Sequence, residues 1–200
     1  MNAEMVLPLA MFAAVSSLTP GPNNLMLMSS GANFGFRRTI PHMLGVSIGF
    51  CLMLVLVGLG VMQLFDLIPY SFEVLRLLCF GYLLYLAYKI FTSGEPSSGN
   101  LAAHPFTFTQ AALFQWLNPK AWTMALSAVS VYAPTRDVYT VMSIGVIFAL
   151  VNLPCVGSWS LVGEKLTSWL TSPWRLRVFN TLMATLLVLS VAPSLWSATF

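Results

Sequence analysis

The stretch QWLNPKAW, residues 115–122, places a lysine directly after a proline inside a long apolar segment of the chain. The residues on either side, 106–119 and 121–135, carry no charge. Because a helix rises about 1.5 Å per residue, Lys120 would lie roughly 20 Å from either end of this segment. A lysine side chain can snorkel over only part of that distance, and a lone cation at such a depth costs about 2.5–3.5 kcal/mol. We therefore expect Lys120 to have a compensating partner, of which a bound ligand is the leading candidate.

The composition of the whole chain indicates that this segment lies in a membrane. Of the 200 residues, 58% are hydrophobic and 8% are charged, whereas a soluble domain carries about 25% charged residues. Six segments have the roughly 20 residues needed to cross the hydrocarbon core, and they carry few or no charges. The sequence therefore predicts an all-α membrane protein with six transmembrane helices: 5–36, 39–65, 72–91, 106–132, 138–163 and 178–200.

The basic residues predict how these helices are oriented. The loops after the first, third and fifth spans share one side of the membrane and carry most of the lysines and arginines, which places that side in the cytoplasm. Both termini would then be extracytoplasmic. The residues on the basic side are Arg37, Arg38, Lys89, Lys165, Arg175 and Arg177, against Arg76 and Arg136 on the other side.

The segment 92–105 is rich in Ser, Gly, Pro and Asn and reads as a cytoplasmic linker between two halves, 1–91 and 106–200. Each half has three spans, and an odd number of spans makes the second half begin on the opposite side of the membrane, as in an inverted repeat. A shift of 99 positions places Pro20 on Pro119. We therefore expect two inverted three-helix repeats.

Prolines are expected to break the first and fourth helices at these matching positions. A proline has no N–H to donate and clashes with the carbonyl four residues earlier. Irregular backbone at membrane depth is tolerated only where it is buried in protein or lines a wet cavity. Paired breaks in two halves are typical of a transporter's binding site. The candidate substrate-binding residues are Thr19, Pro20, Pro22, Asn23, Asn118, Pro119 and Lys120.

Each of these residues also has a structural interpretation. Lys120 could bind a substrate carboxylate or couple to protons, or it could be a structural cation held by freed carbonyls. Asn23 and Asn118 could bind a zwitterion through their amides, or they could satisfy the broken backbone. Gly31, Gly35, Gly45 and Gly49 have the spacing of close helix contacts, either within the chain or across a homodimer seam.

Other classes of function find little support. An intramembrane enzyme needs a nucleophile with a base, or a metal, and no Asp, Glu or His lies centrally in a predicted span. We therefore expect no enzyme activity, no cofactor and no metal. No basic cluster with interleaved aromatic residues suggests nucleic acid as a partner. His42 and His104 are expected in solvated or interfacial positions, and a channel lined by the broken helices remains an alternative.

Two motifs together resemble the LysE/RhtB family of amino-acid exporters: TPGPN at 19–23 followed by GFRR at 35–38, and LNPKAW at 117–122. The run TPGPNN with residues 25–30 is most similar to the cysteine and O-acetylserine exporter branch. This resemblance implies a bacterial inner-membrane protein that exports amino acids or close derivatives, driven by the proton-motive force. A small-metabolite channel, or an exporter of some other solute, is the alternative.

Overall fold

The computed structural model describes residues 3–61, 63, 67, 70–93, 104–134 and 137–196. Their regular structure is entirely helical, which confirms the all-α prediction for these residues. The linker residues 94–103 and Arg136 lie outside the described residues, as do the side chains of Glu73 and Arg76. The helices are α1 (Ala3–Leu18), α2 (Pro22–Phe34), α3 (Phe36–Gly58), α5 (Ser71–Phe91), α6 (Phe108–Leu117), α7 (Pro119–Tyr132), α8 (Val138–Leu166) and α9 (Pro173–Trp196).

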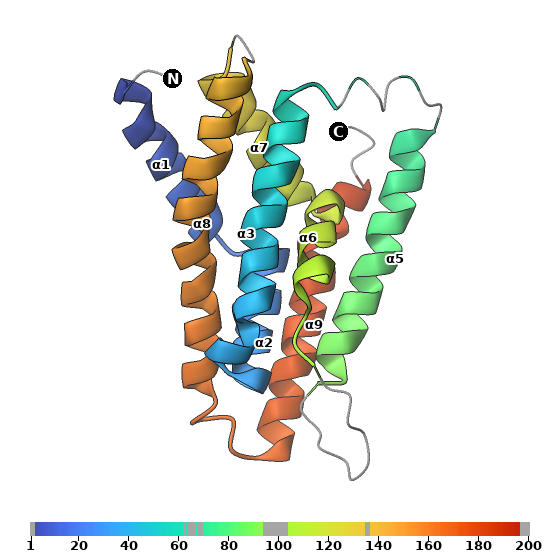
Figure 1. Ribbon diagram of the computed structural model, residues 1–200. Coiled ribbons are helices and arrows are strands. Elements are labelled where there is room, and N and C mark those ends of the chain that lie inside the picture. Colours follow the sequence, from blue (N-terminus) through green and yellow to red (C-terminus); the bar gives the residue numbers. More distant parts are fainter. Residues whose placement is uncertain are drawn as a thin grey trace.

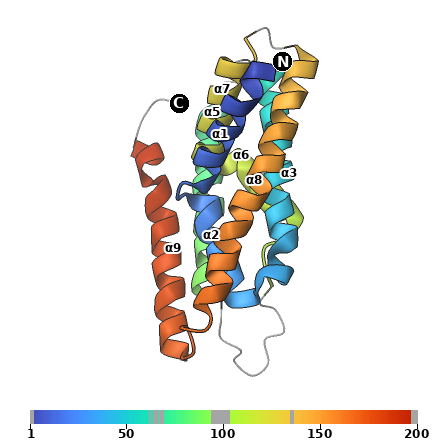
Figure 2. The same cartoon turned by 90° about the vertical axis from the view of Figure 1, so that its left-hand side faces the viewer.

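The helices form one elongated bundle (Figures 1 and 2). α1 ends halfway along the bundle and α2 continues toward the lower end of Figure 1, whereas α6 lies in the middle of the bundle and α7 continues to the upper end. α1 starts at the upper end of the bundle, and α9 runs from the lower end toward the upper end. The two terminal helices are therefore antiparallel, as expected when both termini lie on the same side of the membrane. Which end faces the cytoplasm stays a prediction.

The structure supports fewer membrane spans than the sequence predicts. Within the described residues, α3 and α8 are long and apolar enough to cross a bilayer. α1 and α2 together would make a third span, bent by 60° at its break. Six spans arranged as an inverted repeat therefore remain a prediction.

Both expected helix breaks are present, and at each of them a helix restarts at a proline. α2 begins at Pro22 and α7 at Pro119, the first helical position, where a missing N–H matters least. The residues before them, Gly21 and Asn118, have extended backbone conformations. The side chain of Asn118 also accepts a hydrogen bond of 3.1 Å from the backbone N–H of Lys120, which caps α7.

Glycines let two pairs of helices approach until their backbones touch. A Cβ on Gly31 of α2 would collide with the backbone of Ser160 in α8. A Cβ on Gly45 of α3 would collide with the carbonyl of Phe108 in α6, and one on Gly49 would lie 2.5 Å from the Cα of Ala112. These three glycines therefore pack within the chain, as one of the two interpretations expected.

The helix contacts are centred on α3 and α8. α8 packs along α1 and α2, and α3 packs along α6 and α7, while α3 contacts α8 and α5 contacts α9. One apolar cluster, which includes Phe50 and Phe148, joins α1, α3, α7 and α8; another, which includes Phe114 and Leu86, joins α2, α5, α6 and α9. At each break the chain passes between these clusters, because α1 and α7 contribute to the first and α2 and α6 to the second.

Candidate functional site

Lys120 connects the two breaks. Its Nζ donates to the carbonyl oxygen of Thr19 at 2.6 Å and to the Thr19 hydroxyl at 2.8 Å, and it lies 3.4 Å from the carbonyl oxygen of Pro20. Carbonyls at the C-terminal end of a helix have no helical partner and carry a partial negative charge. The end of α1 therefore supplies the compensating partner that a buried lysine requires.

Gly21 provides the space for this lysine. A Cβ at position 21 would lie 2.8 Å from Cδ and 3.2 Å from Nζ of Lys120, closer than van der Waals contact allows. A residue without a side chain therefore lets the lysine lie along the first break and reach its carbonyls.

A pair of amides forms a second bridge between the two broken helices. Asn23 of α2 donates from Nδ2 to Oε1 of Gln115 at 2.8 Å, and Gln115 of α6 donates from Nε2 to Oδ1 of Asn23 at 3.2 Å. Gln115 also donates to the carbonyl of Ala111 at 2.8 Å, which fixes its orientation. Sequence reasoning selected Asn23 but missed Gln115, although Gln115 lies four residues before Pro119 and its carbonyl loses a helical donor there.

Other polar side chains satisfy the broken backbone itself. Asn24 donates from Nδ2 to the carbonyls of Ser17 and Thr19, both at 2.8 Å, and so closes the end of α1. Asn118, which is buried, instead accepts through Oδ1 from the backbone N–H of Lys120 and so caps the start of α7. Of the two interpretations of Asn118, the observed hydrogen bond corresponds to the one in which its side chain satisfies the broken backbone.

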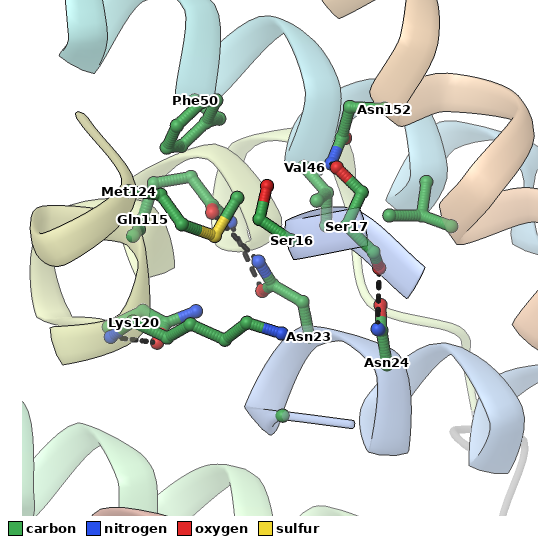
Figure 3. Close-up of a pocket in the computed structure, with 14 residues that line it drawn as sticks. Ser16, Ser17, Asn23, Asn24, Val46, Phe50, Gln115, Lys120, Met124 and Asn152 are labelled. Carbon is green, nitrogen blue, oxygen red and sulfur yellow. Dashed lines mark hydrogen bonds between the residues drawn. The ribbon is translucent and has the colours of Figure 1, made fainter. Parts of the chain in front are cut away.

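These side chains surround a small cavity (Figure 3). Its volume is about 20 Å³, enough for about one water molecule. Of the seven predicted site residues, Asn23, Asn118 and Lys120 line it, whereas Thr19, Pro20, Pro22 and Pro119 do not. The polar lining residues that the prediction did not include are Ser16, Ser17, Asn24, Gln115 and Asn152.

Lys120 is the single charged side chain among the residues that line the cavity, and the others are neutral. A site with one cation, several amides and no carboxylate favours a ligand that carries an anionic group. The cation is already paired with backbone oxygens, so a ligand that also carries a cation could replace it there. The site therefore suits a zwitterion.

The structure corrects the placement of His42. The sequence suggested an interfacial position, but α3 begins at Phe36, and His42 is fully buried nearly two turns later. Its ring meets Phe106 edge-to-face, with centroids 5.2 Å apart, and neither ring nitrogen has a hydrogen-bond partner among the described residues. His104 is exposed, as expected. No group of three His, Cys, Asp or Glu side chains that could bind a metal occurs in the described part of the chain.

A helical bundle with apolar spans and paired breaks around a polar cavity belongs to the class of membrane transport proteins. The family model for LysE type translocators matches residues 14–196, and the chain belongs to that family.

The chain is also similar to curated efflux proteins. The chain is 28% identical to the cysteine/O-acetylserine efflux protein of Escherichia coli strain K12 over 155 residues, which is 76% of this chain and 79% of the relative. The proteins of that name from Shigella flexneri and Escherichia coli O1:K1 are 28% and 27% identical over the same shares. No solved structure matches the chain.

Proposed function

We propose that this protein exports amino acids or close derivatives across the bacterial inner membrane. The observation that carries the proposal is the bond between Lys120 and the first break, in the wall of a cavity whose lining has no other charge. The family supports translocation, and the names of the relatives point to small amino acids. Six spans, arranged as two inverted halves with extracytoplasmic termini, would provide the framework.

The site suggests how a zwitterion would bind. Its carboxylate would accept hydrogen bonds from Lys120 and would lie near the N-terminal ends of α2 and α7, which carry a partial positive charge. Its ammonium group would take over the carbonyls of Thr19 and Pro20 that Lys120 occupies without substrate. The substrate would thus enter between two groups that are already paired, and the charges would stay balanced at every stage.

Alternating access would require the cavity to open toward each side in turn. The first broken helix (α1 and α2) packs on α8, the second (α6 and α7) packs on α3, and α3 packs closely on α8, so we propose that the two broken helices move relative to each other while the α3–α8 contact is kept. The Lys120–Thr19 and Asn23–Gln115 hydrogen bonds cross from one broken helix to the other. They are therefore the bonds that would break or rearrange on opening.

Uptake of labelled amino acids into inverted membrane vesicles, with and without a proton gradient, tests this function. We expect saturable uptake that the gradient accelerates and that Lys120→Ala abolishes in correctly inserted protein. A channel would instead give uptake that does not saturate and that no gradient can drive uphill. Normal export by Lys120→Ala would refute the assignment of the site.

A further inference from the structure

We propose that Asn152 and Ser17 form a subsite that hydrogen-bonds a polar atom in the side chain of the transported amino acid. The protein would thereby select small, neutral, polar amino acids. The inference rests on the export function proposed above and assigns roles to two residues that neither the motifs nor the family resemblance identified.

The position of Asn152 indicates that it would face the side chain of a bound substrate. It belongs to α8 and lies across the cavity from Lys120, with Ser17 pointing toward it from the last turn of α1 (Figure 3). If Lys120 holds the carboxylate and the carbonyls of the first break hold the ammonium group, both polar groups on the α-carbon are fixed at one side. The substrate side chain is then directed to the opposite side, where Asn152 lies.

The hydrogen bonds of Asn152 leave capacity for a ligand. Its Oδ1 accepts from the hydroxyl of Ser47 at 2.8 Å, and its Nδ2 donates to the hydroxyl oxygen of Ser17 at 2.9 Å. An asparagine amide has two N–H donors and an oxygen with two lone pairs. The bonds among the described residues use one of each, so one donor and one acceptor site remain. Ser47 and the carbonyl of Ser17, which accepts from Asn24, fix the geometry of the subsite.

A second buried asparagine shows what a purely structural amide looks like in this protein. Asn180 donates from Nδ2 to Oδ1 of Asn33 at 3.1 Å and to the carbonyl of Ser93 at 2.6 Å, and it accepts from Asn33 at 2.8 Å. Both of its donors are used, and it does not line the cavity. Asn180 of α9 links α2 to Ser93, just after the end of α5, whereas Asn152 combines a similar degree of burial with free capacity at the cavity wall.

The rest of the lining limits which side chains fit. None of the described residues that line the cavity is acidic, so a lysine or arginine substrate would find no partner for its side-chain charge. The cavity volume is about 20 Å³, and Phe50 and Met124 form part of its wall, so the lining leaves little room for a large side chain. A hydroxyl or thiol on the β-carbon is small and polar, and it would exchange hydrogen bonds with Asn152 and Ser17.

Competition against labelled L-serine uptake in inverted vesicles tests the proposal. The competitors are L-serine and L-2-aminobutyrate, which differ only by a hydroxyl in place of a methyl group, together with L-lysine. We expect the wild type to prefer serine over 2-aminobutyrate by roughly 3- to 10-fold, the range of one net hydrogen bond, and lysine to compete poorly. Asn152→Ala and Ser17→Ala should reduce the serine preference toward 1.

Asn180→Ala is the matched control, since it removes a buried amide of the same kind away from the cavity, and its serine preference should equal that of the wild type. Ser17→Ala removes a single oxygen and keeps the test decisive where Asn152→Ala lowers the amount of folded protein. An unchanged serine preference in inserted Asn152→Ala and Ser17→Ala would overturn the inference, as would a wild type without the preference. Lys120→Ala separates the two proposals: if it abolishes uptake while the Asn152 variants keep wild-type selectivity, only the subsite is wrong.

Discussion

Two regions of this bundle join helices in opposite ways. At the α2–α8 and α3–α6 contacts, glycines bring backbones together without any side chain between them. At the breaks, side chains of Lys120, Asn23 and Gln115 reach across and form specific hydrogen bonds. Backbone contact gives a fixed packing distance, whereas a bond from a flexible side chain can exchange its partner. The glycine contacts that fix helix spacing are thus separate from the side-chain hydrogen bonds that can change partners, as the proposed alternating access requires.

The largest effect is expected at the exchangeable region. Lys120→Ala removes the single cation of the cavity lining, and loss of a buried, hydrogen-bonded charge partner typically costs about 2–5 kcal/mol of binding. Export should fall by at least about 30-fold in vesicles that contain equal amounts of inserted protein. Thermal unfolding in detergent should change little, because Thr19 and Pro20 are exposed and their carbonyls can bond to water when Lys120 is removed. A large loss of stability with normal export would show that the Lys120 bond stabilises the fold and does not serve transport.

The second largest effect is expected on stability, at the glycine contact between α2 and α8. Gly31→Ala places a Cβ against the backbone of Ser160, and such overpacking destabilises proteins by about 1–3 kcal/mol. The midpoint of thermal unfolding in detergent should drop. Gly81→Ala in α5 is the control: nothing lies within 4 Å of its added Cβ, and alanine is the better helix former, so stability should stay equal or rise. Equal behaviour of the two variants would contradict the proposed role of the glycine contacts.

Gly21→Ala concerns a glycine that makes room for a side chain, Lys120, and not for another backbone. The new Cβ would lie 2.8 Å from Cδ of Lys120, but that atom belongs to a flexible side chain that can move. Stability should therefore be nearly unchanged, while the displaced ammonium group weakens apparent substrate affinity several-fold. Kinetics of vesicle uptake provide the measurement, and an unaltered affinity would mean that the position of Lys120 is not critical.

The smallest effect is expected for Lys120→Arg. Our hypothesis is that Lys120 stays charged throughout transport, and that coupling arises from the protonation state of the substrate or from water in the cavity. Arginine keeps the charge and does not deprotonate in proteins, so both affinity and gradient-driven uptake should persist at a reduced level. If affinity is kept while the proton gradient no longer drives uptake, Lys120 itself carries the proton.

The sequence predicted those parts of the site that depend on local chemistry. Proline lacks an N–H and clashes within a helix, and the prolines around Gly21 and after Asn118 do break their helices. Proline alone does not decide this, because Pro8, Pro41 and Pro154 lie inside continuous helices. The cost of a cation in an apolar segment likewise identified Lys120. The Asn23–Gln115 pair joins residues 92 positions apart, and Asn152 meets Ser17 across 135 positions. No local pattern reports such pairings, because they arise from how separate helices pack.

The misplaced histidine has a different cause. The prediction for His42 rested on its position near the cytoplasmic boundary of the second predicted span, 39–65. In the structure α3 starts at Phe36, and the face that carries His42 also carries Thr39 and Val46, all of which are buried. Burial near the end of a helix depends on which face meets its neighbours, and a charge count does not contain that information.

The bond between Lys120 and Thr19 also bears on the return half of a transport cycle. A carrier that performs net export has to reorient without cargo, and an uncompensated cation in its binding site would oppose that step. Here the empty site neutralises its own lysine with the carbonyls at the end of α1. The protein can therefore reorient without a bare cation in its site, and we expect net efflux down a gradient even when no amino acid is present outside to be exchanged.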